Sequence, residues 1–220
     1  MQKTGKSAFQ FIIATLGVFA ALFGVRLFNQ YLLMGFPLIA RMVLMILTQW
    51  LLFLVPGILM LANKEKLGRL GFTKVGVPKQ ILLGLALALV MSALFTVLPI
   101  LLGFKEYVGS TSYTKAWQFA YEFVYVIFGV ALAEEMVFRG YLFHKLLEIK
   151  NSRWLAIAVT SALFGLLHIF NGSFAQVGLT ALIGFIYCVF REKCRGVTLL
   201  SLIVAHGMYD ALITLWVALL

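Results

Sequence analysis

Several ionisable side chains lie inside long apolar stretches of this 220-residue sequence. They form three groups along the chain: Glu134, Glu135 and Arg139, then His168, then His206 and Asp210. Insertion scales put the cost of a charge in hydrocarbon at roughly 2.5–3.5 kcal/mol, so such residues mark functional sites by default. Carboxylates and imidazoles transfer protons near neutral pH, which makes water activation and hydrolysis the chemistry that these groups can perform.

The spacing within each group predicts how its members are used. Glu135 and Arg139 are four residues apart, so on a helix they share a face and form an ion pair. Glu134 is turned by about 100° from Glu135 on a regular helix, which predicts separate roles for the two carboxylates. Glu135 would form a supporting ion pair with Arg139, and Glu134 would face a cavity. His206 and Asp210 are also four residues apart, so Asp210 can accept a hydrogen bond from the imidazole and fix its tautomer.

The depth of three of these residues predicts a shared site. At about 1.5 Å per residue, Glu134, His168 and His206 lie roughly 16, 22 and 14 Å from the basic ends of their segments. Glu134 and His168 could activate a water there while His206 donates to a developing oxyanion, which would make a peptide hydrolase. The same three side chains are also a possible zinc set, because two histidines and a glutamate bind catalytic zinc. The sequence leaves the metal-free and metal-bound alternatives open.

A membrane-embedded helical bundle is the element that must hold these groups. Apolar residues make up 63% of the chain, charged residues only 12%, and the mean hydropathy is +1.02. Soluble domains are roughly half apolar and about a quarter charged, so a water-soluble domain is excluded. The apolar runs are continuous rather than alternating, which favours α-helices over a β-barrel. Short loops predict one domain over residues 1–220.

The sequence divides into seven apolar segments, which predicts an all-α bundle of seven spans. They are Ala8–Arg26, Ala40–Ala62, Gln80–Gly103, Trp117–Leu146, Arg153–Phe170, Phe174–Phe190 and Val197–Leu220. An eighth span would require the last segment to split near Gly207. The first segment follows Lys3 and Lys6, as in a signal peptide, but no convincing small-x-small cleavage site follows it, so we expect it to be retained.

The basic residues predict the orientation of the bundle. Most of the 18 Lys and Arg residues fall in loops on the side of the N-terminus, which predicts a cytoplasmic N-terminus and an external C-terminus. This asymmetry also explains the net charge of +10, so no nucleic-acid partner is expected. A disulfide between Cys188 and Cys194 has no support from the sequence.

Three motifs resemble those of the type II CAAX prenyl endopeptidase family. They are E-E-x-x-x-R at Glu134–Arg139, F-x-x-x-H at Phe164–His168 and H-x-x-x-D at His206–Asp210. This is the CPBP or Abi group of intramembrane proteases, which includes bacteriocin-processing and self-immunity proteins. The resemblance covers roughly residues 119–215, and the first three segments match only in being apolar.

The resemblance implies roles for the motif residues. Glu134 and His168 would activate water, His206 with Asp210 would stabilise the oxyanion, and Glu135, Arg139 and Phe164 would be supporting residues. The last family motif often ends in Asn, whereas this chain has Asp210. An ionised carboxylate cannot donate a hydrogen bond, so Asp210 either stays protonated or orients His206.

The expected function is therefore an intramembrane endopeptidase acting on a membrane-associated or prenylated peptide or protein. The small size and short loops look prokaryotic, so a prokaryotic plasma membrane is the expected location. One rival is a non-catalytic immunity protein or scaffold with the same fold. Another is a transporter or proton relay, because intramembrane Glu and His also serve proton transfer.

Overall fold

The computed structural model describes residues 2–171 and 174–220. All secondary-structure elements in these residues are helices, and none is a strand. The long helices, some of them interrupted by 3₁₀ or π turns, are α1 (Gln2–Tyr31), α2–η2–α3 (Leu38–Gln49, Trp50–Phe53, Leu54–Ala62), α4–η4–α5 (Val77–Ser92, Ala93–Val97, Leu98–Leu101), α7 (Ala116–Tyr125), η5 (Val126–Ala131), α8 (Leu132–Glu135), η6 (Met136–Leu142), α9 (Phe143–Lys150), α10 (Arg153–Leu167), α11 (Phe174–Lys193) and α12 (Leu199–Leu219). The short connecting elements are η1 (Leu33–Gly35), η3 (Leu67–Leu70), α6 (Lys105–Val108) and η7 (Ile169–Asn171). The predicted all-helical class is confirmed.

Six helices of the described residues are long and apolar enough to cross a membrane, and this supports an integral membrane protein. The expected fifth span, Arg153–Phe170, is not among them. Its helix α10 has 15 residues, which at about 1.5 Å per residue is roughly 22 Å, short of a hydrocarbon core of about 30 Å. The helix stops at His168, although apolar residues continue beyond it, so seven full spans are not confirmed.

The last expected segment is one unbroken helix, α12, and it does not divide at Gly207. Gly207 instead allows close packing against η5: a Cβ atom there would lie 2.6 Å from the side chain of Ile127. This contact accounts for the glycine without a helix break, and an eighth span is not confirmed.

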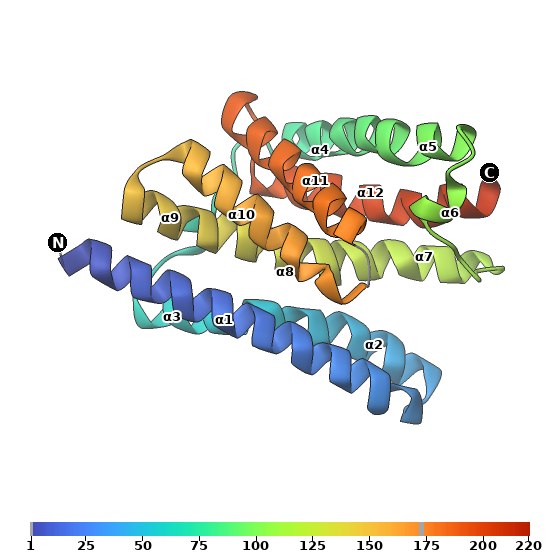
Figure 1. The fold of residues 1–220 in the computed structure, drawn as a ribbon, viewed down its shortest axis with the longest axis horizontal. Helices are drawn as coiled ribbons and strands as arrows, with labels where there is room; N and C mark the ends of the chain where they lie inside the picture. The colour runs from blue at the N-terminus through green and yellow to red at the C-terminus, as the bar shows by residue number, and fades with distance from the viewer. Residues whose placement is uncertain (1, 172–173) are drawn as a thin grey trace.

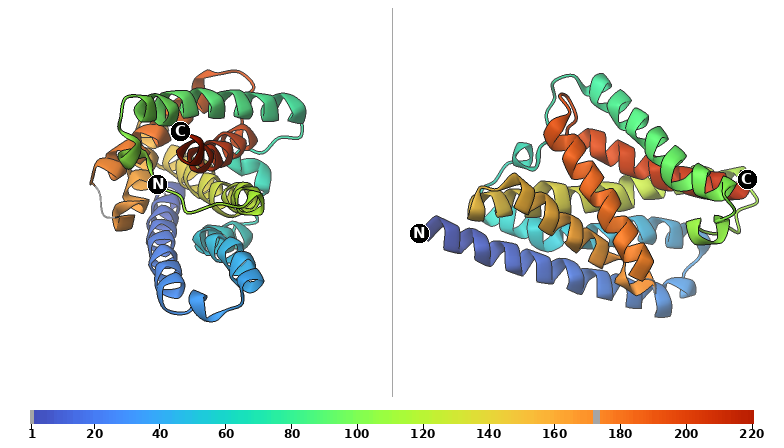
Figure 2. Two further views of the ribbon diagram at one scale, coloured as in Figure 1. Left: turned by 90° about the vertical axis from the view of Figure 1, so that its right-hand side faces the viewer. Right: turned by 45° about the horizontal axis from the view of Figure 1, so that its top comes forward.

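The segment α7–α9 runs through the middle of the bundle (Figure 1 and Figure 2). Helices α12 and α4 lie on one side of it, α1 and α2–α3 lie on the other, and the α10–α11 hairpin crosses its front. The N- and C-termini lie at opposite ends of the bundle (Figure 1). The central position of α7–α9 surrounds the two glutamates of α8 with protein.

Two π-helical turns, η5 and η6, flank α8. A π turn departs from the regular pairing of an α-helix and is often found at functional sites. Side chains from other helices donate to carbonyl oxygens in both turns: Trp50 Nε1 lies 3.1 Å from the oxygen of Phe128, and Arg191 binds the oxygen of Arg139. These bonds fix the irregular turns, and with them the directions of the glutamate side chains.

Candidate active site

His206 lies at the centre of the site, and it is only 5% exposed. Its Nδ1 atom lies 2.9 Å from Oε1 of Glu135. Its Nε2 atom lies 3.3 Å from Oδ2 of Asp210 and 3.8 Å from Oε2 of Glu134. The structure therefore surrounds one imidazole with three carboxylates, two from α8 and one from α12.

The predicted ion pair between Glu135 and Arg139 is present, at 2.9 Å, and both side chains are fully buried. The Arg139 guanidinium also stacks on Phe164, 4.0 Å from the ring centroid. Gly184 of α11 leaves room for this stack, because a Cβ atom there would lie 2.8 Å from Arg139 and 3.0 Å from Phe164. Arg139 is thus held by an ion pair on one side and an aromatic face on another.

The expectation that the two glutamates point to separate places is wrong in one respect, since both reach His206. Glu135 contacts one ring nitrogen and Glu134 approaches the other. The rotation of about 100° between neighbours holds for Cβ directions, but glutamate side chains are long and an imidazole offers nitrogens on two sides. The π turns on both sides of α8 further change the geometry from that of a regular helix.

His168 lies at the end of α10 and is partly exposed. Its Nδ1 atom is 3.2 Å from the carbonyl oxygen of Phe164. The Phe164 ring lies 5.4 Å from the His168 ring and 5.7 Å from the His206 ring, centroid to centroid, so it packs against both histidines. Glu134 and His168 are near enough to interact electrostatically, and no direct hydrogen bond joins them among the described residues.

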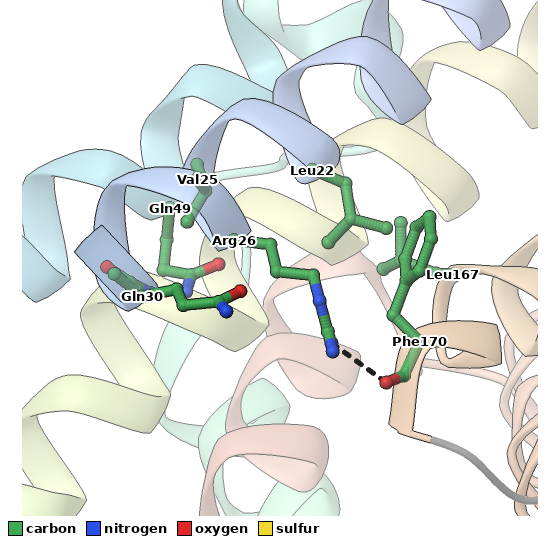
Figure 3. Close-up of a pocket in the computed structure, with 8 residues that line it drawn as sticks. Leu22, Val25, Arg26, Gln30, Gln49, Leu167 and Phe170 are labelled. Carbon is green, nitrogen blue, oxygen red and sulfur yellow. Dashed lines mark hydrogen bonds between the residues drawn. The ribbon is translucent and has the colours of Figure 1, made fainter.

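A cavity of about 490 Å³ lies between α1, α2 and the C-terminal end of α10, and Figure 3 shows its lining residues. Its lining includes Leu167 and Phe170, on either side of His168 in the sequence, and polar side chains of α1 and α2. Arg26 points across it to the carbonyl oxygen of Phe170, at 2.8 Å (Figure 3). Neither Glu134 nor His168 is among the residues that line this cavity, so it is not the chamber that the sequence predicted these two side chains to share.

The candidate zinc set does not fit a metal in this arrangement. Within residues 2–171 and 174–220, no three His, Cys, Asp or Glu side chains are placed to hold a metal ion together. Glu134 Oε2 and His206 Nε2 lie 3.8 Å apart, but His168 does not join them in a set of three ligands. We therefore derive no step through a metal.

A polar cluster that sequence reasoning missed continues the site along α7 and α12. Glu122 of α7 accepts a hydrogen bond from Tyr113, at 3.0 Å, and it also hydrogen-bonds Thr214 and interacts electrostatically with Asp210. Burial and the Glu122 charge raise the pKa of Tyr113 to about 12. The i, i+4 series His206, Asp210 and Thr214 on one face of α12 is the signal that could have revealed it.

Comparison with known families agrees with the motifs. Residues 116–212, which contain every side chain around His206, match the family model described as "Type II CAAX prenyl endopeptidase Rce1-like". The resemblance predicted from the three motifs is thus confirmed over this part of the chain, and it is a resemblance to a family of membrane proteases. No curated protein and no solved structure matched the chain.

Proposed function

We propose that this protein is an intramembrane endopeptidase in which Glu134 activates the attacking water. The observation that carries the proposal is that the Glu134 carboxylate is buried next to His206 and lacks a hydrogen-bond partner on one oxygen within the described part of the chain. Among the described residues, its Oε2 atom is buried without a hydrogen-bond partner, 3.8 Å from His206 Nε2. A buried polar atom without a partner calls for an explanation, and a water or substrate group bound there would supply one. The family match over residues 116–212 supports the same chemistry.

In the proposed reaction, Glu134 takes a proton from water as the water oxygen attacks the carbonyl carbon of the peptide bond. The resulting oxyanion accepts a hydrogen bond from His206 Nε2. The C–N bond then breaks, and the proton held by Glu134 passes to the leaving amine. The products are a carboxylic acid, which then loses its proton to solvent, and an amine, and Glu134 returns to its ionised starting form.

The hydrogen bonds around His206 define the form that can serve this role. Glu135, ionised beside Arg139, can only accept, so His206 Nδ1 carries a hydrogen toward it. Donation from Nε2 to an oxyanion then requires a hydrogen on that nitrogen as well. Asp210, 3.3 Å from Nε2, accepts that hydrogen before substrate binds and so orients the ring.

Glu135, Arg139 and Phe164 act in this proposal as positioning residues, because their contacts run through His206 or through each other. His168 helps Glu134 to activate the water, and its electrostatic interaction with Glu134 supports this role. The substrate in this proposal is a membrane-associated or prenylated peptide or protein. The protein itself lies in the lipid bilayer of a prokaryotic plasma membrane, with its N-terminus in the cytoplasm.

The test compares Glu134→Gln with Glu192→Gln, a matched change on α11 at a glutamate that pairs with Arg153. Purified variants are incubated with a peptide library and the products identified by mass spectrometry. Glu134→Gln should lower cleavage by about 10²-fold or more while thermal unfolding stays the same, and Glu192→Gln should cleave normally. Equal cleavage by both variants would contradict the role of Glu134. An immunity phenotype that survives Glu134→Gln in cells would favour the scaffold instead.

A further inference from the structure

The two ends of the bundle differ in how they cover the site. At the end nearer the N-terminus, every residue from Ala133 to Phe143 is buried, and Lys145 follows with 2% exposure. Lys145 Nζ lies 2.6 Å from Glu65 and 3.3 Å from Glu148, and Ser7 donates to Glu148 at 2.6 Å. These bonds join α1, α9 and the segment after α3, so they close this end over Glu134.

The opposite end carries a cavity where α10 stops. Helix α10 ends at Leu167, well short of the end of the bundle where α7 begins and α12 ends (Figure 1). The cavity of about 490 Å³ lies at this stop, and we call it the vestibule; it is lined by Leu22, Val25, Arg26, Asn29, Gln30, Gln49, Leu167 and Phe170. Its volume is within the range of roughly 300–1,000 Å³ typical of ligand pockets.

Polar groups lead from the vestibule and from the same end of the bundle toward the reacting residues. Gln49 lines the vestibule and donates to the Tyr125 hydroxyl at 3.0 Å, on the helix that continues into α8. On the α12 side, the Asp210 side chain is 30% exposed, and Thr214, Glu122 and Tyr113 extend beyond it in the same direction. Polar side chains at membrane depth face protein or water-filled space, so they mark a wet route.

The geometry points to substrate and water entering from the membrane face opposite the N-terminus, through the vestibule. Because most basic loop residues lie on the N-terminal side, that face is the external one. The substrate is therefore a peptide segment presented outside the cytoplasm, such as the external part of an exported or membrane-inserted chain. This inference rests on the proposed function for its substrate, but not for the direction of access.

The vestibule lining suits a peptide chain. The amides of Asn29, Gln30 and Gln49 each offer a donor and an acceptor, the same pair that a peptide group presents. Asn29 Oδ1 is buried and has no partner among the described residues, so one acceptor stands ready for a peptide N–H. Leu22, Val25 and Leu167 supply apolar wall for side chains.

Access is tested first without any cleavage assay, in right-side-out membrane vesicles. Leu167→Cys in the vestibule is compared with Leu146→Cys at the closed end, since the two leucines are similarly buried, at 5% and 7%. Both carry Cys194→Ser, because the native Cys194 is exposed. A small, membrane-impermeant thiol reagent should modify Leu167→Cys about tenfold faster than Leu146→Cys. Equal rates, or faster modification of Leu146→Cys, would overturn the proposed entrance.

Orientation is read from Cys194 in the unmodified chain, which lies in the basic loop after α11. An impermeant maleimide should leave Cys194 unlabelled until the vesicles are permeabilised. Labelling of Cys194 in intact vesicles would place the vestibule end in the cytoplasm and overturn an external substrate.

The last experiment tests whether blocking the vestibule prevents cleavage. A bulky impermeant thiol reagent on Gln30→Cys should reduce cleavage of added peptide at least about tenfold, whereas the same reagent on Lys105→Cys of α6, outside the vestibule, should not. Unchanged cleavage by modified Gln30→Cys would overturn the entrance. Absence of cleavage by every variant, with the labelling pattern intact, would count against the proposed function alone.

Discussion

Glu135 Oε1 holds His206 and Arg139 at the same time, at 2.9 Å from His206 Nδ1 and 2.9 Å from the Arg139 guanidinium. One oxygen thus joins α8, η6 and α12, and it fixes the ring whose other nitrogen faces Glu134. A carboxylate in this position orients an imidazole and balances a buried cation, so a structural pair and the reacting group form a single unit.

Removing one member of the buried pair should cost more than removing both. Arg139→Ala leaves Glu135 as an uncompensated buried charge and should lower stability by about 3–5 kcal/mol. The double variant Glu135→Leu with Arg139→Met removes both charges and should recover most of that loss, yet remain inactive because His206 has lost its partner. Thermal unfolding in detergent measures the first effect and peptide cleavage the second. A double variant less stable than Arg139→Ala would show that the pair itself stabilises the fold.

Gly184→Ala should disturb the site from the α11 side. The added Cβ would meet Arg139 at 2.8 Å and Phe164 at 3.0 Å, so the guanidinium must shift, at a cost of about 1–3 kcal/mol. Gly178→Ala on the same helix is the control, because a Cβ there meets nothing within 4 Å. We expect Gly178→Ala to keep both the unfolding temperature and the cleavage rate, and Gly184→Ala to lower both. Equal behaviour of the two variants would refute this packing argument.

Asp210→Asn should retain activity, to within about tenfold, because an amide oxygen can still accept from His206 Nε2. Asp210→Ala removes the acceptor and should lower kcat more than it raises KM, as expected when ring orientation rather than substrate binding is lost. Steady-state cleavage kinetics separate these outcomes. Full activity of Asp210→Ala would leave orientation of the ring to Glu135 alone.

The hydrogen bond between Tyr113 and Glu122 should make stability depend on alkaline pH. Burial and the Glu122 charge raise the pKa of Tyr113 to about 12 in the folded protein, from an ordinary value of 10.0. A raised pKa favours the protonated hydroxyl in the folded state, so its contribution is complete below pH 10 and is lost as the pH rises toward 12. Unfolding of the wild type and Tyr113→Phe, compared across that window, should show their stability difference shrinking. A constant difference would contradict the shift.

The sequence predicted the parts of this site that depend on helix spacing. The Glu135–Arg139 pair and the approach of Asp210 to His206 both follow from an i, i+4 interval and need no knowledge of tertiary structure. The contact of Glu135 with His206 joins residues 71 positions apart, and no local pattern contains it. The sequence therefore identified the residues and predicted the contact of Glu135 with Arg139, but not its contact with His206.

The predicted count of seven spans is not confirmed, for a physical reason that composition does not reveal. Segment Arg153–Phe170 is mostly apolar, but its helix ends at Leu167 and the short 3₁₀ turn η7 follows at Ile169–Asn171. Apolar residues that pack against protein have the same hydropathy as those that face lipid. In the same way, similar depth placed His168 near Glu134, but did not reveal that the Phe164 ring packs against both His168 and His206.

The shortness of α10 also has a consequence for the surrounding lipid. A helix of roughly 22 Å beside acyl chains about 30 Å thick creates a hydrophobic mismatch, which bilayers relieve by thinning next to the short element. We expect headgroups and their hydration shell to sink toward His168, which would bring water to the side of the protein where the proposed hydrolysis needs it.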